Sequence, residues 1–238
     1  MSLIFTLAKR ENLIPSNPIL SADFPAIKTR KKVKTLQPED VQQILRAAAN
    51  EPLQKQVLIH LAFITGCRKG ELAAIRWQSI KWSESAILID QEILYTRDKG
   101  VYIEDGTKNG KDRLLRIPAE TLVLLENYRA SLQIDPESGE YIFPGRYGGA
   151  IFPDSIYTYI KRFEERYDLP KINPHTFRHT LASILLHSGM DAVTVSHRLG
   201  HSQPSTTLNM YGSLILKADM ESAEAAADAI FRGKKVGK

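Results

Sequence analysis

Apolar residues recur at intervals of three and four along most of this chain, the spacing that places them on one face of an α-helix. Pro38 occupies the position of a first helical residue, and Gly66 follows an apolar stretch as a residue that ends a helix. The periodicity predicts helices within 38–48, 53–66, 71–77, 119–132, 154–167, 174–189, 191–201, 204–212 and 217–231. The inward residues are expected to be Val41, Ile44, Leu45 and Ala48, then Ile156, Ile160 and Phe163, and then Phe177, Leu181, Ile184 and Leu185.

The region between residues 86 and 117 has a different pattern. The segments "AILID", "EILY", "VYIE" and "RLLRIP" are short and β-prone, and the turn-forming stretches "RDKG" and "DGTKNGK" separate them. This pattern predicts one small antiparallel sheet. The expected fold class is therefore mainly α with a small antiparallel β-sheet, an α+β fold.

Shifts in composition predict how the chain is organised. The first helix would have Ile4 and Leu7 on one face, and it is too short to bury that face by itself. The expected organisation is a helix over 1–20, a basic linker over 21–35, a main domain over 36–213, and a C-terminal helix with a basic tail over 214–238.

Composition limits the class of protein. The chain has 238 residues, of which 43% are apolar, enough for one domain with a full core. No apolar run approaches the roughly 20 residues of a membrane span, and no signal peptide is visible, so we expect a cytoplasmic protein without a membrane partner. The only cysteine, Cys67, excludes an internal disulfide and a cysteine-based zinc site.

The net charge of +5 and the pI of about 9.2 are basic without being extreme. Residues 28–34 and 107–116 concentrate positive charge, as a surface that follows phosphates would. A solvated linker explains the first run equally well, so charge alone does not decide the partner.

The stretch "HTFRHTLAS" carries the strongest chemical signal. His175 and Arg178 are three residues apart at the start of a predicted helix, so they are expected to project from one face, away from the apolar residues. Free backbone N–H groups and the helix dipole favour an anion at the same place. A phosphate fits best, because an arginine can bind two phosphate oxygens at once and a histidine can donate a hydrogen bond or move a proton.

Two other interpretations of this stretch remain open. His175 and His179 have the spacing of a zinc-binding helix, but "HTFRH" lacks the glutamate of HExxH and places a cation between the ligands. The purely structural interpretation has His175 capping the helix and Arg178 pairing with a surface acid.

Further candidate residues lie far apart in the sequence. Arg68 lies in "TGCRKGEL", Lys108 in "TKNGKDRLLRIP" and His201 in "RLGHS", and Tyr211 follows ten residues after that histidine. In this order, together with "HTFRH", they resemble the boxes of the tyrosine recombinases, the phage-integrase type of site-specific recombinase. The resemblance covers roughly residues 36–213.

The resemblance implies a role for each matching residue. Glu71 matches the acidic position of the first box and is expected to support the arginine. Lys111 is a rival for the hairpin lysine, although Lys108 fits the spacing to Arg113 better. The implied catalytic residues are Arg68, Lys108, His175, Arg178, His201 and Tyr211.

The family's chemistry gives further expectations. The resemblance implies cleavage and rejoining of double-stranded DNA through a 3′-phosphotyrosyl intermediate, with no metal, cofactor or ATP. It implies a homotetramer on paired recombination sites and a monomer when free. Residues 1–20 would be the last helix of a preceding DNA-clamping domain. Residues 214–238 would dock on the catalytic domain, either their own or a neighbour's.

Two rival functions remain at this stage. A type IB topoisomerase uses similar residues to relax supercoils, and would act on a plasmid that lacks any recombination site. A DNA-binding regulator without chemistry would leave Lys108 and Tyr211 without a purpose.

Overall fold

The computed structural model describes residues 2–20, 22, 35–105, 112–133, 135, 139–145, 149–201 and 203–208. The chain divides into two compact units, Met1–Lys32 and Val33–Lys238, and each is described by itself. Outside the described residues lie Lys108, Lys111, Tyr211, the predicted C-terminal segment 214–238, and all but residues 22 and 35 of the predicted linker.

The first unit contains a shorter helix than the sequence predicted. Helix α1 (Ser2–Arg10) ends well before residue 20, so the expected extent was wrong. Asn12 adopts a left-handed backbone with a φ of 54°, which turns the chain out of the helix. Nδ2 of Asn17 then donates to Oγ1 of Thr6 over 3.0 Å, which folds the following segment back toward the helix. The apolar side chains Leu3, Ile4 and Leu7 of α1 are exposed.

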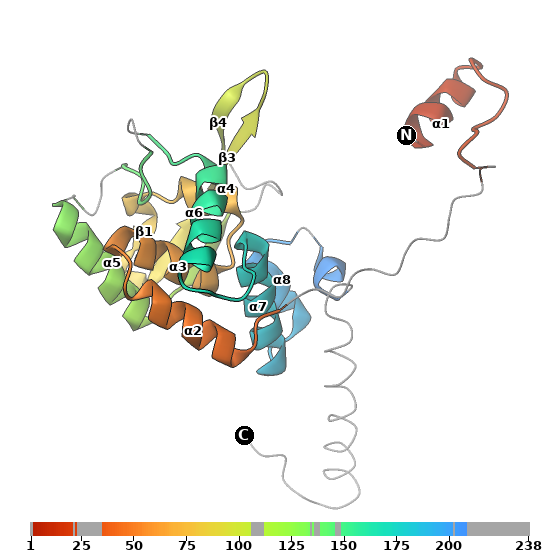
Figure 1. The fold of residues 1–238 in the computed structure, drawn as a ribbon. Coiled ribbons are helices and arrows are strands. Elements are labelled where there is room, and N and C mark those ends of the chain that lie inside the picture. Colours follow the sequence, from red (N-terminus) through yellow and green to blue (C-terminus); the bar gives the residue numbers. More distant parts are fainter. Residues whose placement is uncertain are drawn as a thin grey trace, which may run out of the picture. The chain divides into compact units, whose positions relative to one another are not determined.

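The second unit is mainly helical with short antiparallel strands, which confirms the predicted fold class (Figure 1). The described helices are α2 (Pro38–Ala48), α3 (Leu53–Thr65), α4 (Lys69–Ala74), α5 (Ala119–Leu132), α6 (Pro153–Arg166), α7 (Pro174–His187) and α8 (Ala192–Leu199). Two 3₁₀ turns are η1 (Trp77–Ser79) and η2 (Trp82–Glu84). The predicted helix over 71–77 is thus divided, because α4 ends at Ala74 and Trp77 begins a separate turn. In the described part of the chain, no helix has the length and hydropathy needed to cross a membrane.

The strands form two antiparallel sheets instead of the single sheet expected. They are β1 (Ile80–Lys81), β2 (Ala86–Ile89), β3 (Gln91–Thr96), β4 (Gly100–Asp105) and β5 (Arg113–Arg116). The first sheet has the order β1-β2-β5, whereas β3 and β4 form a hairpin that extends away from the helices (Figure 1). Only Asp90 separates β2 from β3, which is too short for a hairpin between them. Strand β2 therefore pairs with the later β5, in a register that places Ile89 opposite Arg113.

The core is centred on α3, which packs against α5 and α7. The predicted inward residues Ile44, Ala48, Ile156, Ile160, Phe163, Phe177 and Leu181 are buried, and Val41, Leu45 and Leu185 pack partly buried against the core. Ile184 is 47% exposed, so its predicted inward position was wrong. The reason is a change of partner along α7: its C-terminal half packs on α8 through Leu181, Ala182 and Leu186, so the buried face rotates away from Ile184.

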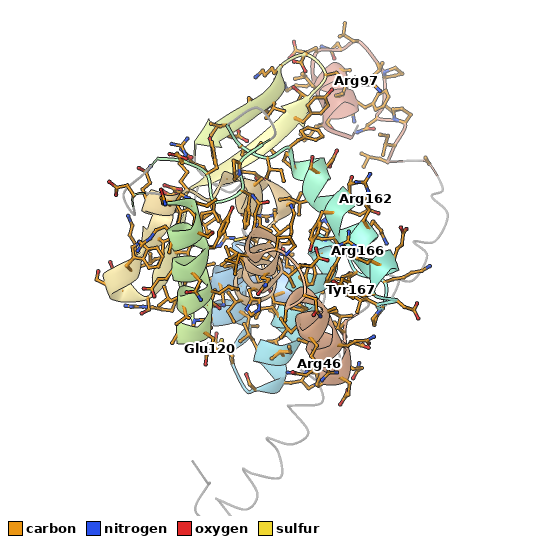
Figure 2. The ribbon with its side chains drawn as sticks, turned by 60° about the vertical axis from the view of Figure 1, so that its left-hand side comes forward. Arg46, Arg97, Glu120, Arg162, Arg166 and Tyr167 are labelled. Atoms are coloured by element: carbon orange, nitrogen blue, oxygen red, sulfur yellow. The ribbon has the colours of Figure 1, made fainter. Side chains whose placement is uncertain are left out.

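A buried carboxylate also ties α6 to the turn before α3. Glu51 is 6% exposed, accepts a hydrogen bond from the Tyr159 hydroxyl and pairs with Arg166. Figure 2 shows Arg162 and Arg166 along α6, and Phe163 of the same helix is buried in the core. Helix α6 is thus fixed by packing on one face and by this ion pair at its C-terminal end.

Gly66 ends α3 and provides the first testable prediction. Its φ is +60°, and a Cβ placed there would lie 2.8 Å from Leu199 Cδ2 and 3.0 Å from Leu181 Cδ2. Gly66→Ala should therefore combine left-handed backbone strain with overpacking, and lower the free energy of unfolding by about 2–4 kcal/mol in urea titrations.

Gly189→Ala is the matched control. Gly189 also has a positive φ, +84°, but no atom of the described residues lies within 4 Å of the position that a Cβ would take there. This variant should lose only about 1–2 kcal/mol, the backbone contribution. If the two variants lost the same free energy of unfolding, the side chains of Leu181 and Leu199 would not pack as closely against Gly66 as the structure shows.

Candidate active site

Arg68 lies at the N-terminal end of α4, in the turn that Gly66 begins. Its backbone N–H donates to Oε2 of Glu71 over 2.8 Å, and its Nη1 donates to Oε1 of the same carboxylate over 2.9 Å. Its Nη2 donates to the carbonyl of Gly200 over 3.3 Å. The side chain is 23% exposed, so these bonds hold a guanidinium that solvent, or a bound group, can still reach.

Arg178 lies on the first turns of α7 and is 5% exposed. Its Nη1 donates to the carbonyl of Gly66 over 2.8 Å, whereas its Nη2 is buried with no hydrogen-bond partner among the described residues. Burial and the nearby charge of Arg68 lower the pKa of Arg178 to about 10. A buried cation beside a second cation is costly unless an anion joins them, so this position favours an anionic ligand.

This geometry bears on the two other interpretations of "HTFRHTLAS". The side chain that caps α7 is Asn173, whose Oδ1 accepts from the Thr176 N–H over 3.0 Å, so the proposed cap by His175 was wrong. Arg178 binds a carbonyl and is buried, so neither its expected exposure nor a pairing with a surface acid is found in the described structure. For the zinc interpretation, the described residues contain no cluster of three or more His, Cys, Asp or Glu side chains that could hold a metal ion.

Two histidines complete the described part of the site. His175 lies on the first turn of α7, and its pKa is lowered by partial burial of its ring and by the charges of Arg178, Arg68 and Lys69. His201 follows the left-handed Gly200 that ends α8, and its Nδ1 lies 2.8 Å from Oγ1 of Thr207. Burial, and then the charges of Arg178 and Arg68, lower the pKa of His201 to about 4. Both rings are therefore neutral at neutral pH.

A cavity of about 530 Å³ opens beside His175. Its other lining residues are Lys69, Tyr157, Asn173, Pro174, Thr176 and His179. Burial and the charges of His175 and Arg178 lower the pKa of His179 to about 4, so this ring is neutral as well. Lys69 adds a cation at the wall of the cavity, where its ammonium group pairs with the carboxylate of Asp154.

The structure thus brings together four of the predicted residues, Arg68, His175, Arg178 and His201, which come from the start of α4, α7 and the end of α8. The charges of Arg68 and Arg178 lower the pKa of both histidines. Lys108 and Tyr211 lie outside the described residues and stay predictions. Glu71 supports Arg68 as expected, because it is 1% exposed and accepts two bonds from that residue.

Sequence reasoning missed two residues near the site. Thr207 is fully buried and orients His201, and no sequence pattern singles it out. Arg113 is 3% exposed on β5 and binds Glu71 with both terminal nitrogens. Strand alternation was a usable signal here, because "RLLR" places Arg113 on the same face as the buried Leu115.

Comparisons with known proteins agree with this arrangement. The model of the phage integrase family matches residues 34–215. The ICEBs1 integrase of Bacillus subtilis (strain 168) is 29% identical over 97% of this chain and 64% of its own length. The tyrosine recombinase XerC of Anoxybacillus flavithermus is 31% identical over 83% of this chain and 63% of its own length. The chain thus spans less than two thirds of the length of these curated relatives.

Solved structures show the same fold. The Tn1549 transposon integrase, in complex with a circular intermediate DNA, superposes with a TM-score of 0.76 and 21% identity, covering 93% of this chain and 76% of that one. The XerA recombinase superposes with a TM-score of 0.62 and 21% identity, covering 86% and 71%. The described elements therefore adopt the fold of a tyrosine recombinase catalytic domain.

The lowered pKa of His201 predicts how stability depends on pH. The unfolded histidine titrates near pH 6.5 and the folded one near 4, so below about 6.5 the unfolded chain binds more protons. The stability that the folded protein gains from a neutral His201 is therefore complete above pH 6.5, and it is lost as the pH falls toward 4. His201→Gln does not titrate, so its melting temperature should fall less than the parent's between pH 7 and pH 4.5.

His187→Gln is the control for this comparison, because His187 is exposed at the opposite end of α7. We expect this variant to keep the parent's dependence of melting temperature on pH. If His201→Gln kept it too, the ring of His201 would not lie among the arginines in the folded protein.

Proposed function

Because the chain belongs to the phage integrase family, we propose that it carries the catalytic domain of a site-specific DNA recombinase, which cuts and rejoins DNA through a 3′-phosphotyrosine. The observation that carries the proposal is the buried Nη2 of Arg178, which has no partner among the described residues and lies in the same site as Arg68. A DNA phosphate supplies the anion that this pair of cations favours.

The two arginines would bind the nonbridging oxygens of the scissile phosphate. Attack on a phosphodiester places additional negative charge on these oxygens, so fixed guanidinium groups stabilise the transition state more than the ground state. Arg178 is fixed by its bond to the Gly66 carbonyl, and Arg68 by Glu71 and the Gly200 carbonyl. Neither side chain then needs to reorganise as charge develops.

His201 would donate a further hydrogen bond to the phosphate. If the Thr207 hydroxyl donates to Nδ1, the neutral ring carries its proton on Nε2, and this nitrogen can donate to a phosphate oxygen. The buried Thr207 would thus select the tautomer that can donate to the phosphate. The bound phosphate would offset the positive charges that lower the pKa of His201 in the free protein.

The remaining steps involve Tyr211 and Lys108, which lie outside the described residues, together with His175. The phenol oxygen of Tyr211 would attack phosphorus while the bond from phosphorus to the 5′ oxygen breaks, and the phenolic proton would pass to the neutral ring of His175. Lys108 would give a proton to the departing 5′ oxygen. The phosphotyrosyl bond keeps the energy of the phosphodiester, so the 5′-hydroxyl of a second strand can reverse the step.

We also propose the partners of the protein and the way in which its copies assemble. Double-stranded DNA is the substrate, and four copies would assemble on a pair of recombination sites, with a monomer when free. The segment 214–238 would dock on a neighbouring copy, and residues 1–20 would belong to a DNA-clamping domain. The protein would act in the cytoplasm.

Trapping the covalent intermediate tests the proposal. The probe is a pool of end-labelled, nicked duplexes of random sequence, in which cleavage close to the nick releases a short fragment and cannot be reversed. The parent should give a protein–DNA band that survives denaturation. Tyr211→Phe removes one oxygen and should abolish that band while leaving DNA affinity within about threefold.

Tyr157→Phe is the matched control, because this tyrosine lines the cavity beside His175. It should keep the band, since its hydroxyl is not the proposed nucleophile. A band of parental intensity from Tyr211→Phe, or no band from the parent, would contradict the proposed chemistry. Relaxation of plasmids without any selected site would instead favour the topoisomerase function.

A further inference from the structure

Glu71 is shared by two arginines, and only one of them reaches the proposed phosphate site. Its Oε1 accepts from Nη1 of Arg68 over 2.9 Å and from Nη1 of Arg113 over 3.1 Å. Its Oε2 accepts from Nη2 of Arg113 over 2.7 Å and from the backbone N–H of Arg68 over 2.8 Å. These three residues are named here the Arg68–Glu71–Arg113 triad.

Arg113 is too enclosed to bind DNA itself. It is 3% exposed, and its other contacts are also within the protein: Nε donates to the carbonyl of Arg198 over 3.1 Å, and Nη2 approaches Sγ of Cys67 at 3.7 Å. Any effect of Arg113 on the reaction must therefore pass through the groups that it holds.

A second set of contacts leads from Arg113 to the same place. A Cβ on Gly200 would lie 2.6 Å from Nη1 and 2.9 Å from Cζ of Arg113, so the guanidinium lies directly against this backbone. The carbonyl of Gly200 accepts from Nη2 of Arg68. Arg113 thus contacts both acceptors that hold the Arg68 side chain, the carboxylate of Glu71 and the turn at Gly200.

Charge gives Arg113 a second effect. Burial by itself raises the pKa of Glu71, but the hydrogen bonds and charges of Arg113 and Arg68 lower it below its ordinary value, so the carboxylate is ionised. With Arg113 present, the triad has two positive charges and one negative charge. Without Arg113, Glu71 would neutralise Arg68, and less of its field would act on a phosphate.

We propose that Arg113 is a positioning residue for strand cleavage: it shares the charge of Glu71 and fixes Arg68 toward the scissile phosphate. This inference rests on the proposed function, because it concerns the rate of the same cleavage step. It assigns a role to a buried residue of β5 that does not touch the substrate.

A double-mutant cycle tests this role under single-turnover conditions, with the adduct-forming duplex selected from the random pool. Arg113→Lys keeps the charge but loses the bidentate geometry, and should lower the cleavage rate constant by about 10- to 100-fold, with DNA affinity within about threefold of the parent. In an Arg68→Ala background, the same change should cost less than about threefold, because its target is gone. Arg162→Lys, at an exposed arginine of α6, should stay within about threefold of the parent.

A purely structural role gives different results. It would lower the melting temperature and the fraction of protein that reacts, and the losses from Arg113→Lys and Arg68→Ala would multiply. Multiplying losses would overturn the proposal. Absence of cleavage by the parent would overturn both this inference and the proposed function, whereas cleavage with multiplying losses would overturn this inference alone.

A second pair of variants is used if Arg113→Lys does not fold. In one of them a neighbouring residue is changed so that the Arg113 side chain is displaced, while Arg113 itself is kept. Gly200→Ala and Gly189→Ala both place a Cβ at a positive φ, but only the first meets the Arg113 guanidinium. Gly200→Ala should lower the rate constant by at least about tenfold, and Gly189→Ala by less than about threefold. Equal rate constants in the two variants would overturn the proposal.

Discussion

The carboxylate of Glu71 accepts four hydrogen bonds from two arginines, and the geometry of the site depends on it. A buried carboxylate is costly by itself, and a buried arginine is too; together they offset each other's desolvation. Because one carboxylate faces two guanidinium groups, the arrangement retains a positive charge. That charge lies at the N-terminal end of α4, where Arg68 is partly exposed.

The site therefore gathers like charges that the fold must hold together. Arg178 is buried beside Arg68, and both lower the pKa of His201. Backbone carbonyls partly offset this repulsion, since Gly66 accepts from Arg178 and Gly200 accepts from Arg68. Both glycines have a positive φ and end helices, so the residues that stop α3 and α8 also supply acceptors to the site. A bound phosphate would remove the remaining repulsion, so the proposed affinity for an anion would depend on how these helices end.

Much of the fold could be predicted from the sequence because helical periodicity is a local property. The buried faces of α2 and α6 and the helix stop at Gly66 follow from residue spacing alone. The split into two sheets did not, because it depends on the single residue Asp90 between β2 and β3 and on pairing with the distant β5. Ile184 was misplaced for a similar reason, since the partner of α7 changes along its length.

The site could likewise be predicted only in part from the sequence. The order of the boxes identified Arg68, His175, Arg178 and His201, which the fold brings together. The burial of Arg178 was not foreseen, because its acceptor, the carbonyl of Gly66, lies 112 residues earlier in the chain. The partnership of Arg113 with Glu71 spans 42 residues and depends on how β5 packs against β2 and α8. Such pairings are tertiary, and no local pattern encodes them.

The central claim is that the arginines act on the negative charge of the nonbridging oxygens. The most direct measurement compares single-turnover cleavage of a phosphodiester with that of a substrate whose scissile phosphate is an uncharged methylphosphonate. Arg178→Ala should lower the rate constant by about 10²- to 10³-fold on the phosphodiester and by less than about tenfold on the methylphosphonate. Equal losses on the two substrates would contradict the account, because Arg178 would then contribute something other than compensation of that charge.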